Sequence, residues 1–288
     1  MSAGEKLDGT PVPMHFWEGV NKNLIAGDMW GKGNSTTVML LHGGGQTRHA
    51  WKGTGELLAK AGYHAVAIDA RGHGDSDWAA DGAYSQDLMV ADLTCVLASL
   101  GTPNPVLVGA SMGGISSLMA IGEDHIHAKG LVMVDIAPQT EPSGVKRIGE
   151  FMAHKPEGFE SLQEAADWIS AYQPHRKSTS NLSGLAKNLR LNPMGKYSWH
   201  WDPRFMTMRS EIQNREARLN ECTRALNVPT LLVRGALSDI LSEEGAAHFL
   251  SLHPESEYVN ITDAAHMVAG DRNDIFSKSI LSFLKRNT

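Results

Sequence analysis

The stretch Gly109-Ala110-Ser111-Met112-Gly113-Gly114 decides the fold class of this chain. It follows a short apolar run, residues 105–108, and precedes a helical pattern that begins at Gly113. A serine flanked by glycines between a strand and a helix predicts a sharp, strained turn that exposes the hydroxyl at the strand end. The N-terminus of the following helix directs unpaired N–H groups at an oxyanion that would develop there. A glycine-rich turn with an incidental serine is the alternative, but this context favours Ser111 as a nucleophile.

Two loops downstream of Ser111 offer the partners that a serine nucleophile needs. The expected chain order is serine, then an acid, then histidine. His266 lies just beyond the last predicted strand, residues 257–261, and we expect it to be the general base. Asp239 follows the predicted strand 229–234. We expect Asp239 to accept the histidine N–H and so to fix the correct tautomer.

A second aspartate, Asp135, remains open as an alternative acid. It ends the predicted strand 130–135, so its carboxylate could reach the same edge of the sheet. Asp135 runs directly into Ile136-Ala137-Pro138, a stiff exit that favours a backbone-anchoring role. Asp239 follows a glycine in a polar loop that is free to direct a carboxylate. We therefore predict Asp239 as the acid.

Another glycine-rich loop, His42-Gly43-Gly44-Gly45, ends the predicted strand 36–41. We expect a backbone N–H of Gly44 or Gly45 to join that of Met112 in stabilising an oxyanion. A phosphate-binding loop is excluded, because neither a following Lys-Ser or Lys-Thr pair nor a helix-opening G-x-G-x-x-G pattern is present. The segment Arg71-Gly72-His73-Gly74 is expected to form a structural turn beside the site.

Around these motifs, short apolar runs alternate with helical patterns, which predicts an α/β fold with a mostly parallel sheet. Two strands near the N-terminus, residues 14–20 and 23–30, are expected to be antiparallel. Residues 139–227 show helical patterning without a convincing buried strand and are rich in Met, Trp, Phe and His. We predict a core domain formed by residues 1–138 and 228–288, with residues 139–227 as a helical cap.

Composition excludes several classes of function. The 288 residues are 42% hydrophobic and 20% charged, with a net charge of −6, which argues against nucleic-acid or anionic-membrane partners. The first residues lack an apolar run, no stretch approaches a membrane span, and the two cysteines do not suggest a disulfide framework. These features predict a cytoplasmic protein. The pair His125-x-His127 is expected to lie in a polar loop at a helix end, and we expect no metal or organic cofactor.

Taken together, these motifs resemble the α/β-hydrolase superfamily, in particular its cap-bearing serine esterases, cofactor-free haloperoxidases and C–C hydrolases. The resemblance covers nearly the whole chain and is weakest in the cap. It implies an eight-stranded, mostly parallel sheet with helices on both faces. Haloalkane dehalogenases and epoxide hydrolases share this layout but need an aspartate where this chain has Ser111, which argues against both.

The combined expectation is a serine hydrolase that cleaves a small or medium carboxylic ester through an acyl-enzyme, with a Ser-His-Asp triad. A C–C bond hydrolase or a lactonase could use the same triad. Known C–C hydrolases tend to carry a tryptophan beside the histidine, whereas this chain has Met267 next to His266. A ligand-binding receptor on the same fold is the alternative outside enzymes. The expected partner is a small ester-like molecule.

Overall fold

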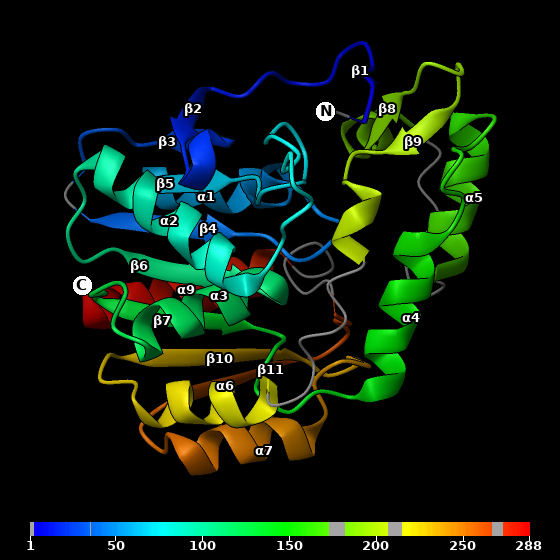
Figure 1. The fold of residues 1–288 in the computed structure, drawn as a ribbon. Coiled ribbons are helices and arrows are strands. Elements are labelled where there is room, and N and C mark those ends of the chain that lie inside the picture. Colours follow the sequence, from blue (N-terminus) through cyan, green and yellow to red (C-terminus); the bar gives the residue numbers. More distant parts are fainter. Residues whose placement is uncertain (1–2, 35, 173–181, 207–214, 267–272) are drawn as a thin grey trace.

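A single eight-stranded sheet forms the centre of the computed structural model, which describes all residues except 1–2, 35, 173–181, 207–214 and 267–272 (Figure 1). The strand order is β11-β10-β7-β6-β4-β5-β3-β2. The strands from β5 to β11 pair in parallel, whereas β3 pairs antiparallel with both β2 and β5. The strands are β2 (His15–Glu18), β3 (Leu24–Trp30), β4 (Thr37–Leu41), β5 (His64–Ile68), β6 (Val106–Ala110), β7 (Gly130–Val134), β10 (Thr230–Gly235) and β11 (Glu257–Ile261). The predicted fold class is confirmed.

Helices cover both faces of this sheet, because its central strands are apolar on both sides. Along β4, Met39 and Leu41 join the core on one face, while Val38 and Leu40 join the core on the other. The first face is covered by α2 (Gln86–Leu100), α3 (Met112–Gly122), α6 (Arg215–Arg224) and α7 (Glu243–Leu252). The second is covered by α1 (Lys52–Lys60) and α9 (Asn273–Asn287), with the short 3-10 helix η2 (Arg48–Trp51) leading into α1.

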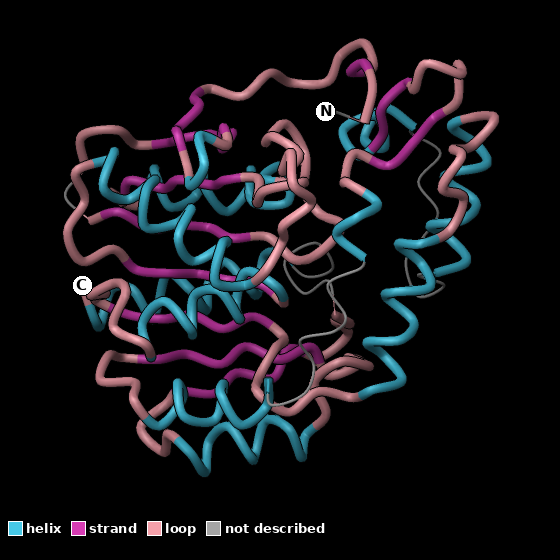
Figure 2. Tube along the Cα trace, viewed as in Figure 1, coloured by secondary structure: helices cyan, strands magenta, loops and turns pink. Residues whose placement is uncertain are grey.

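The segment predicted to form the cap lies beyond the carboxyl ends of the parallel strands, where α4 and α5 stand apart from the sheet (Figures 1 and 2). Its elements are α4 (Pro142–Ala153), α5 (Leu162–Tyr172), the 3-10 helix η3 (Leu182–Asn188), β8 (Leu189–Leu191) and β9 (Tyr197–Trp199). They share a small apolar core of their own, which contains Met152, Phe159, Trp199 and Trp201.

Two features of the cap differ from the expectation. Strands β8 and β9 pair with β1 (Glu5–Lys6) in a three-stranded antiparallel sheet, so the N-terminal segment joins the cap rather than the core. Strands of two or three residues are too short to produce a recognisable alternation in the sequence. In addition, α6 packs against α3 and α7, so it belongs to the core layers although it precedes residue 228.

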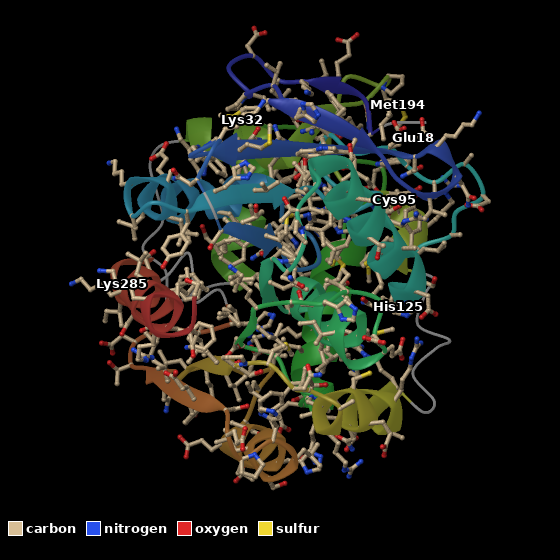
Figure 3. All side chains as sticks on the ribbon, turned by 90° about the vertical axis from the view of Figure 1, so that its left-hand side faces the viewer. Glu18, Lys32, Cys95, His125, Met194 and Lys285 are labelled. Atoms are coloured by element: carbon tan, nitrogen blue, oxygen red, sulfur yellow. The ribbon has the colours of Figure 1, made fainter. Side chains whose placement is uncertain are left out.

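The histidine pair that the sequence analysis considered lies away from the carboxyl edge of the sheet. His125 and His127 follow α3 and pair with Glu123 and Asp124 at 3.4 Å, and His125 lies at the surface of the molecule (Figure 3). Among the described residues, no group of three or more His, Cys, Asp or Glu side chains is arranged to hold a metal ion. No helix within the described ranges is long and apolar enough to cross a membrane.

Candidate active site

The turn at Ser111 joins β6 directly to α3. Ser111 has φ 48° and ψ −114°, a backbone conformation that L-residues rarely adopt, so the turn is strained as predicted. The flanking glycines are required by close packing. A Cβ at Gly109 would overlap the backbone of Gly113, and a Cβ at Gly113 would overlap the carbonyl group of Leu41. The strain and the packing together hold Ser111 at the carboxyl end of the sheet.

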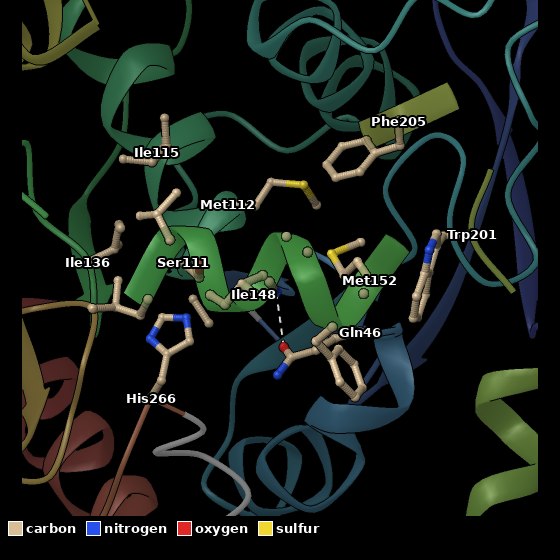
Figure 4. A pocket seen from close by; sticks show the side chains of 18 of the residues that line it. Gln46, Ser111, Met112, Ile115, Ile136, Ile148, Met152, Trp201, Phe205 and His266 are labelled. Atoms are coloured by element: carbon tan, nitrogen blue, oxygen red, sulfur yellow. Dashed lines mark hydrogen bonds between the residues drawn. The ribbon is translucent and has the colours of Figure 1, made fainter. Parts of the chain in front are cut away.

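His266 and Asp135 form the contact that organises the rest of the site. The Nδ1 of His266 lies 2.7 Å from Oδ2 of Asp135, whose side chain is fully buried. The backbone N–H of Gly235 donates to Oδ1 of Asp135 at 2.9 Å, and the Ser238 hydroxyl donates to Oδ2. With Nδ1 engaged, Nε2 of His266 is left for the cavity, on which Ser111 also opens (Figure 4).

Asp239 does not occupy the predicted position beside His266. Its carboxylate pairs with Arg147 of α4 at 2.6 Å, in a partly exposed contact between the core and the cap. The loop after β10 turns toward the cap, so that a Cβ on Gly144 would overlap the carbonyl group of Asp239. Asp135, by contrast, adopts φ 50°, and this left-handed turn after β7 directs its carboxylate toward His266. The prediction that Asp239 accepts the histidine N–H is therefore wrong in this structure, where Asp135, the alternative that the sequence left open, contacts His266.

The expected oxyanion donors divide into two groups. The N–H of Met112 belongs to the first residue of α3 and so has no acceptor within its own helix. Gly44 lines the same cavity, and its N–H donates to no acceptor among the residues that the structure describes. The N–H of Gly45 already donates to Nε2 of His73 at 3.2 Å, which removes it as a candidate. The geometry favours Met112 and Gly44 as the pair of donors.

Three buried histidines hold the loop that carries Gly44. Nε2 of His73 accepts from Gly45 N–H, while Nε2 of His200 contacts the Gly45 carbonyl at 3.3 Å. Nε2 of His42 accepts from the N–H of Ala70 at 2.9 Å. Burial lowers the pKa of His42 to about 4 and that of His73 to about 3, and it pushes the pKa of His200 well below its usual value. Nδ1 of His200 accepts from the N–H of Gly74 at 2.7 Å. Each of the three neutral rings therefore accepts from one backbone N–H.

The side chain of Gln46 fixes the beginning of the same loop. Its Oε1 accepts the N–H of Gly43 at 3.0 Å, the bond drawn dashed in Figure 4. A Cβ on Gly43 would come to 3.2 Å from Cβ of Ser111, so this glycine lets the loop approach the serine closely.

Ser111 and His266 open onto a cavity of about 870 Å³ between the sheet and the cap. The cap contributes Ile148, Met152, Trp199 and Trp201, and the core contributes apolar side chains such as Ile115 and Ile136, several of which are drawn in Figure 4. Trp199 and Trp201 stack on one another with their ring centroids 4.8 Å apart. A cavity of this size and lining suits a small or medium molecule with apolar parts.

Several contributors to this site escaped the sequence analysis. The sequence placed Ser238 in the loop beside the predicted acid, but nothing in it indicated that its hydroxyl supports Asp135. Its Oγ is itself held by the N–H groups of Ile240 and Leu241, both at 3.1 Å. Gln46 and His200 act through the backbone of a loop, and His200 is 155 residues away from Gly45 in the chain. Contacts of that kind leave no local spacing pattern.

Comparisons with known proteins agree with this arrangement. The model of the alpha/beta hydrolase fold family matches residues 36–272. The chain belongs to this family. The esterase Rv0045c of Mycobacterium tuberculosis is 30% identical over 273 residues, which cover 92% of this chain and 87% of that protein. The solved structure of that esterase has a TM-score of 0.73, with 28% identity over 96% of this chain and 93% of the other.

Other comparisons give lower identities. The mouse (Mus musculus) sn-1-specific diacylglycerol lipase ABHD11 is 24% identical over 293 residues, which cover 98% of this chain and 89% of the lipase. The structure of E-2-(acetamidomethylene)succinate hydrolase has a TM-score of 0.82 at 20% identity, and covers 94% of this chain and all of the other. At that identity the likeness concerns the fold alone. The predicted membership of the α/β-hydrolase superfamily is confirmed.

Proposed function

We propose that this protein is a serine hydrolase that cleaves carboxylic esters through an acyl-enzyme, with Ser111 as nucleophile, His266 as general base and Asp135 as the acid. The observation that carries the proposal is the contact of 2.7 Å between His266 and the buried Asp135, on the cavity to which Ser111 is exposed. The strained backbone of Ser111 supports it, because such strain is typical of a nucleophile turn.

In the proposed reaction, His266 takes the proton of Ser111 through Nε2 as the hydroxyl attacks the ester carbonyl. Asp135 accepts the Nδ1 proton and stabilises the imidazolium that forms. The N–H groups of Met112 and Gly44 donate to the oxyanion. His266 then protonates the leaving alcohol, and afterwards activates the water that releases the acid and regenerates Ser111.

The cavity and the relatives support an ester as the substrate. Two relatives that align over most of this chain are named as an esterase and a diacylglycerol lipase. The apolar lining favours a substrate with an aliphatic or aromatic part in contact with Trp199 and Trp201.

Steady-state turnover of p-nitrophenyl butyrate tests this proposal. We expect sustained release of p-nitrophenol over many turnovers, and a loss of about 10⁴-fold or more in kcat in Ser111→Ala. The variant should keep the circular dichroism spectrum and Tm of the wild type. A single stoichiometric burst without turnover would instead indicate a ligand-binding protein, and an active Ser111→Ala enzyme would exclude the proposed mechanism.

A further inference from the structure

The charged residues around the cavity do not balance. Two acidic side chains line it, Asp87 and Asp239. Each already has an arginine partner from the same lining, because Arg218 lies 2.5 Å from Asp87 and Arg147 lies 2.6 Å from Asp239. Two further cations therefore remain, Arg215 and Lys187.

Arg215 has no hydrogen-bond or ion-pair partner among the described residues. It is the first residue of α6 and is partly buried, yet its guanidinium makes no hydrogen bond or ion pair within the described part of the chain. Arg218 lies one turn further along the same helix and donates to both Glu123 and Asp87. Burial alone lowers the pKa of Arg215, whereas the two carboxylates raise the pKa of Arg218.

Lys187 approaches the cavity from the cap, in η3. Within the described ranges, no carboxylate lies in ion-pair distance of its ammonium group. Burial is the main cause that lowers the pKa of His49, which also lines the cavity, and the positive charges of Arg48 and then Lys187 lower it further. Core and cap thus each contribute one unpaired cation to the same space.

An unpaired guanidinium in a partly buried wall is costly unless a ligand supplies the counter-charge. The planar guanidinium matches a carboxylate particularly well, because it can donate two parallel hydrogen bonds. The remainder of the lining is largely apolar and suits a hydrocarbon chain. These properties describe a ligand with an anionic end and an apolar body.

We propose that the preferred substrates are esters that carry a second, free carboxylate, which binds to Arg215. This inference rests on the proposed ester hydrolysis and specifies its substrate class. The carboxylate would hold the apolar chain in the cavity while the ester carbonyl lies against Ser111. Neutral esters lack this anchor and would bind through apolar contacts alone.

Two matched pairs of esters test the proposal. Mono-p-nitrophenyl adipate and p-nitrophenyl hexanoate share a leaving group and a six-carbon acyl chain, and differ in a carboxylate at the end of the acyl chain. The 4-(hexanoyloxy)benzoate anion and its methyl ester place the same difference on the alcohol side. We expect the wild type to have a higher kcat/KM for the charged member of at least one pair. In Arg215→Gln, the ratio of charged to neutral kcat/KM should fall by about tenfold or more, whereas Arg215→Lys should keep part of it.

Arg224→Gln is the matched control, because Arg224 lies on the same helix, is exposed, and pairs with Glu221 away from the cavity. Its ratio of charged to neutral kcat/KM should equal that of the wild type. A measurement without any variant is inhibition of p-nitrophenyl butyrate hydrolysis, in which hexanoate should inhibit the wild type more strongly than the neutral hexanamide does.

The outcomes separate this inference from the function on which it rests. If Ser111-dependent hydrolysis is observed but neither pair shows a charge preference that Arg215→Gln reduces, the carboxylate site is wrong and the esterase proposal stands. If Ser111→Ala hydrolyses these esters as fast as the wild type, the proposed function itself is wrong.

Discussion

At the scale of single residues, the choice between Asp135 and Asp239 has a direct kinetic consequence. Asp135→Asn keeps the shape of the side chain but favours the wrong tautomer of His266, so kcat should fall on the order of 10³- to 10⁴-fold. Asp239→Asn removes only a partly exposed ion pair with Arg147, worth less than about 1 kcal/mol of stability. Initial rates on p-nitrophenyl butyrate and Tm values of both purified variants measure these effects. A severe loss in Asp239→Asn, with Asp135→Asn active, would return the acid to Asp239.

The same residues show what sequence reasoning could and could not reach. Ser111 and His266 were predicted from a strand–turn–helix motif and from chain order, and both lie on one cavity. The sequence places Asp239 rather than Asp135 beside His266, because the stiff segment after Asp135 favours a structural role, whereas the structure shows Asp135 in contact with His266. The deciding feature is a backbone angle, φ 50° at Asp135, and the sequence alone does not reveal that angle.

At the scale of elements, the turn between β6 and α3 depends on glycines that allow the strand, the helix and β4 to pack closely. Gly113→Ala would force a methyl group against the carbonyl group of Leu41. We expect a loss of more than about 2 kcal/mol in the free energy of unfolding, because the methyl group would meet the backbone of the buried strand β4, which cannot move aside. Urea denaturation measures this effect. Gly184→Ala is the control, since a Cβ there meets no atom within 4 Å, and it should change stability by less than about 0.5 kcal/mol. Equal stabilities of the two variants would refute the packing argument.

Element prediction was successful where the hydrophobic period was long enough to detect. The buried strands emerged from runs of apolar residues. The cap sheet did not, because β1, β8 and β9 contain only two or three residues each. The assignment of α6 to the core depends on its packing against α3 and α7, which local patterning cannot distinguish from packing within a cap.

At the scale of the whole molecule, buried neutral histidines make the folded state sensitive to acid. Burial lowers the pKa of His42 to about 4 and that of His73 to about 3, and that of His200 also lies well below its usual value. In the unfolded chain these groups titrate near pH ~6.5. Their contribution to stability is therefore complete above about pH 6.5 and is lost as the pH falls toward the folded-state values. Each histidine should add about 1.4 kcal/mol per pH unit to the slope of stability against pH in this window.

His73→Gln tests this linkage, because a glutamine oxygen can accept from Gly45 N–H but does not titrate. Between about pH 4 and 6, the slope of the unfolding free energy against pH should be smaller by about 1.4 kcal/mol per pH unit than in the wild type. His127→Gln, at a side chain that is 81% exposed, should leave the slope unchanged. A wild-type slope in His73→Gln would show that this ring is not held neutral.

The central claim is that Ser111 is the nucleophile, and covalent labelling tests it most directly. The protein is treated with a serine-directed organophosphate, such as diisopropyl fluorophosphate, and digested, and the peptides are analysed by tandem mass spectrometry. The account predicts one equivalent of label on Ser111, with a parallel loss of esterase activity, and very little label in Ser111→Ala or Asp135→Asn. Label on another residue, or full activity after stoichiometric modification of Ser111, would contradict it.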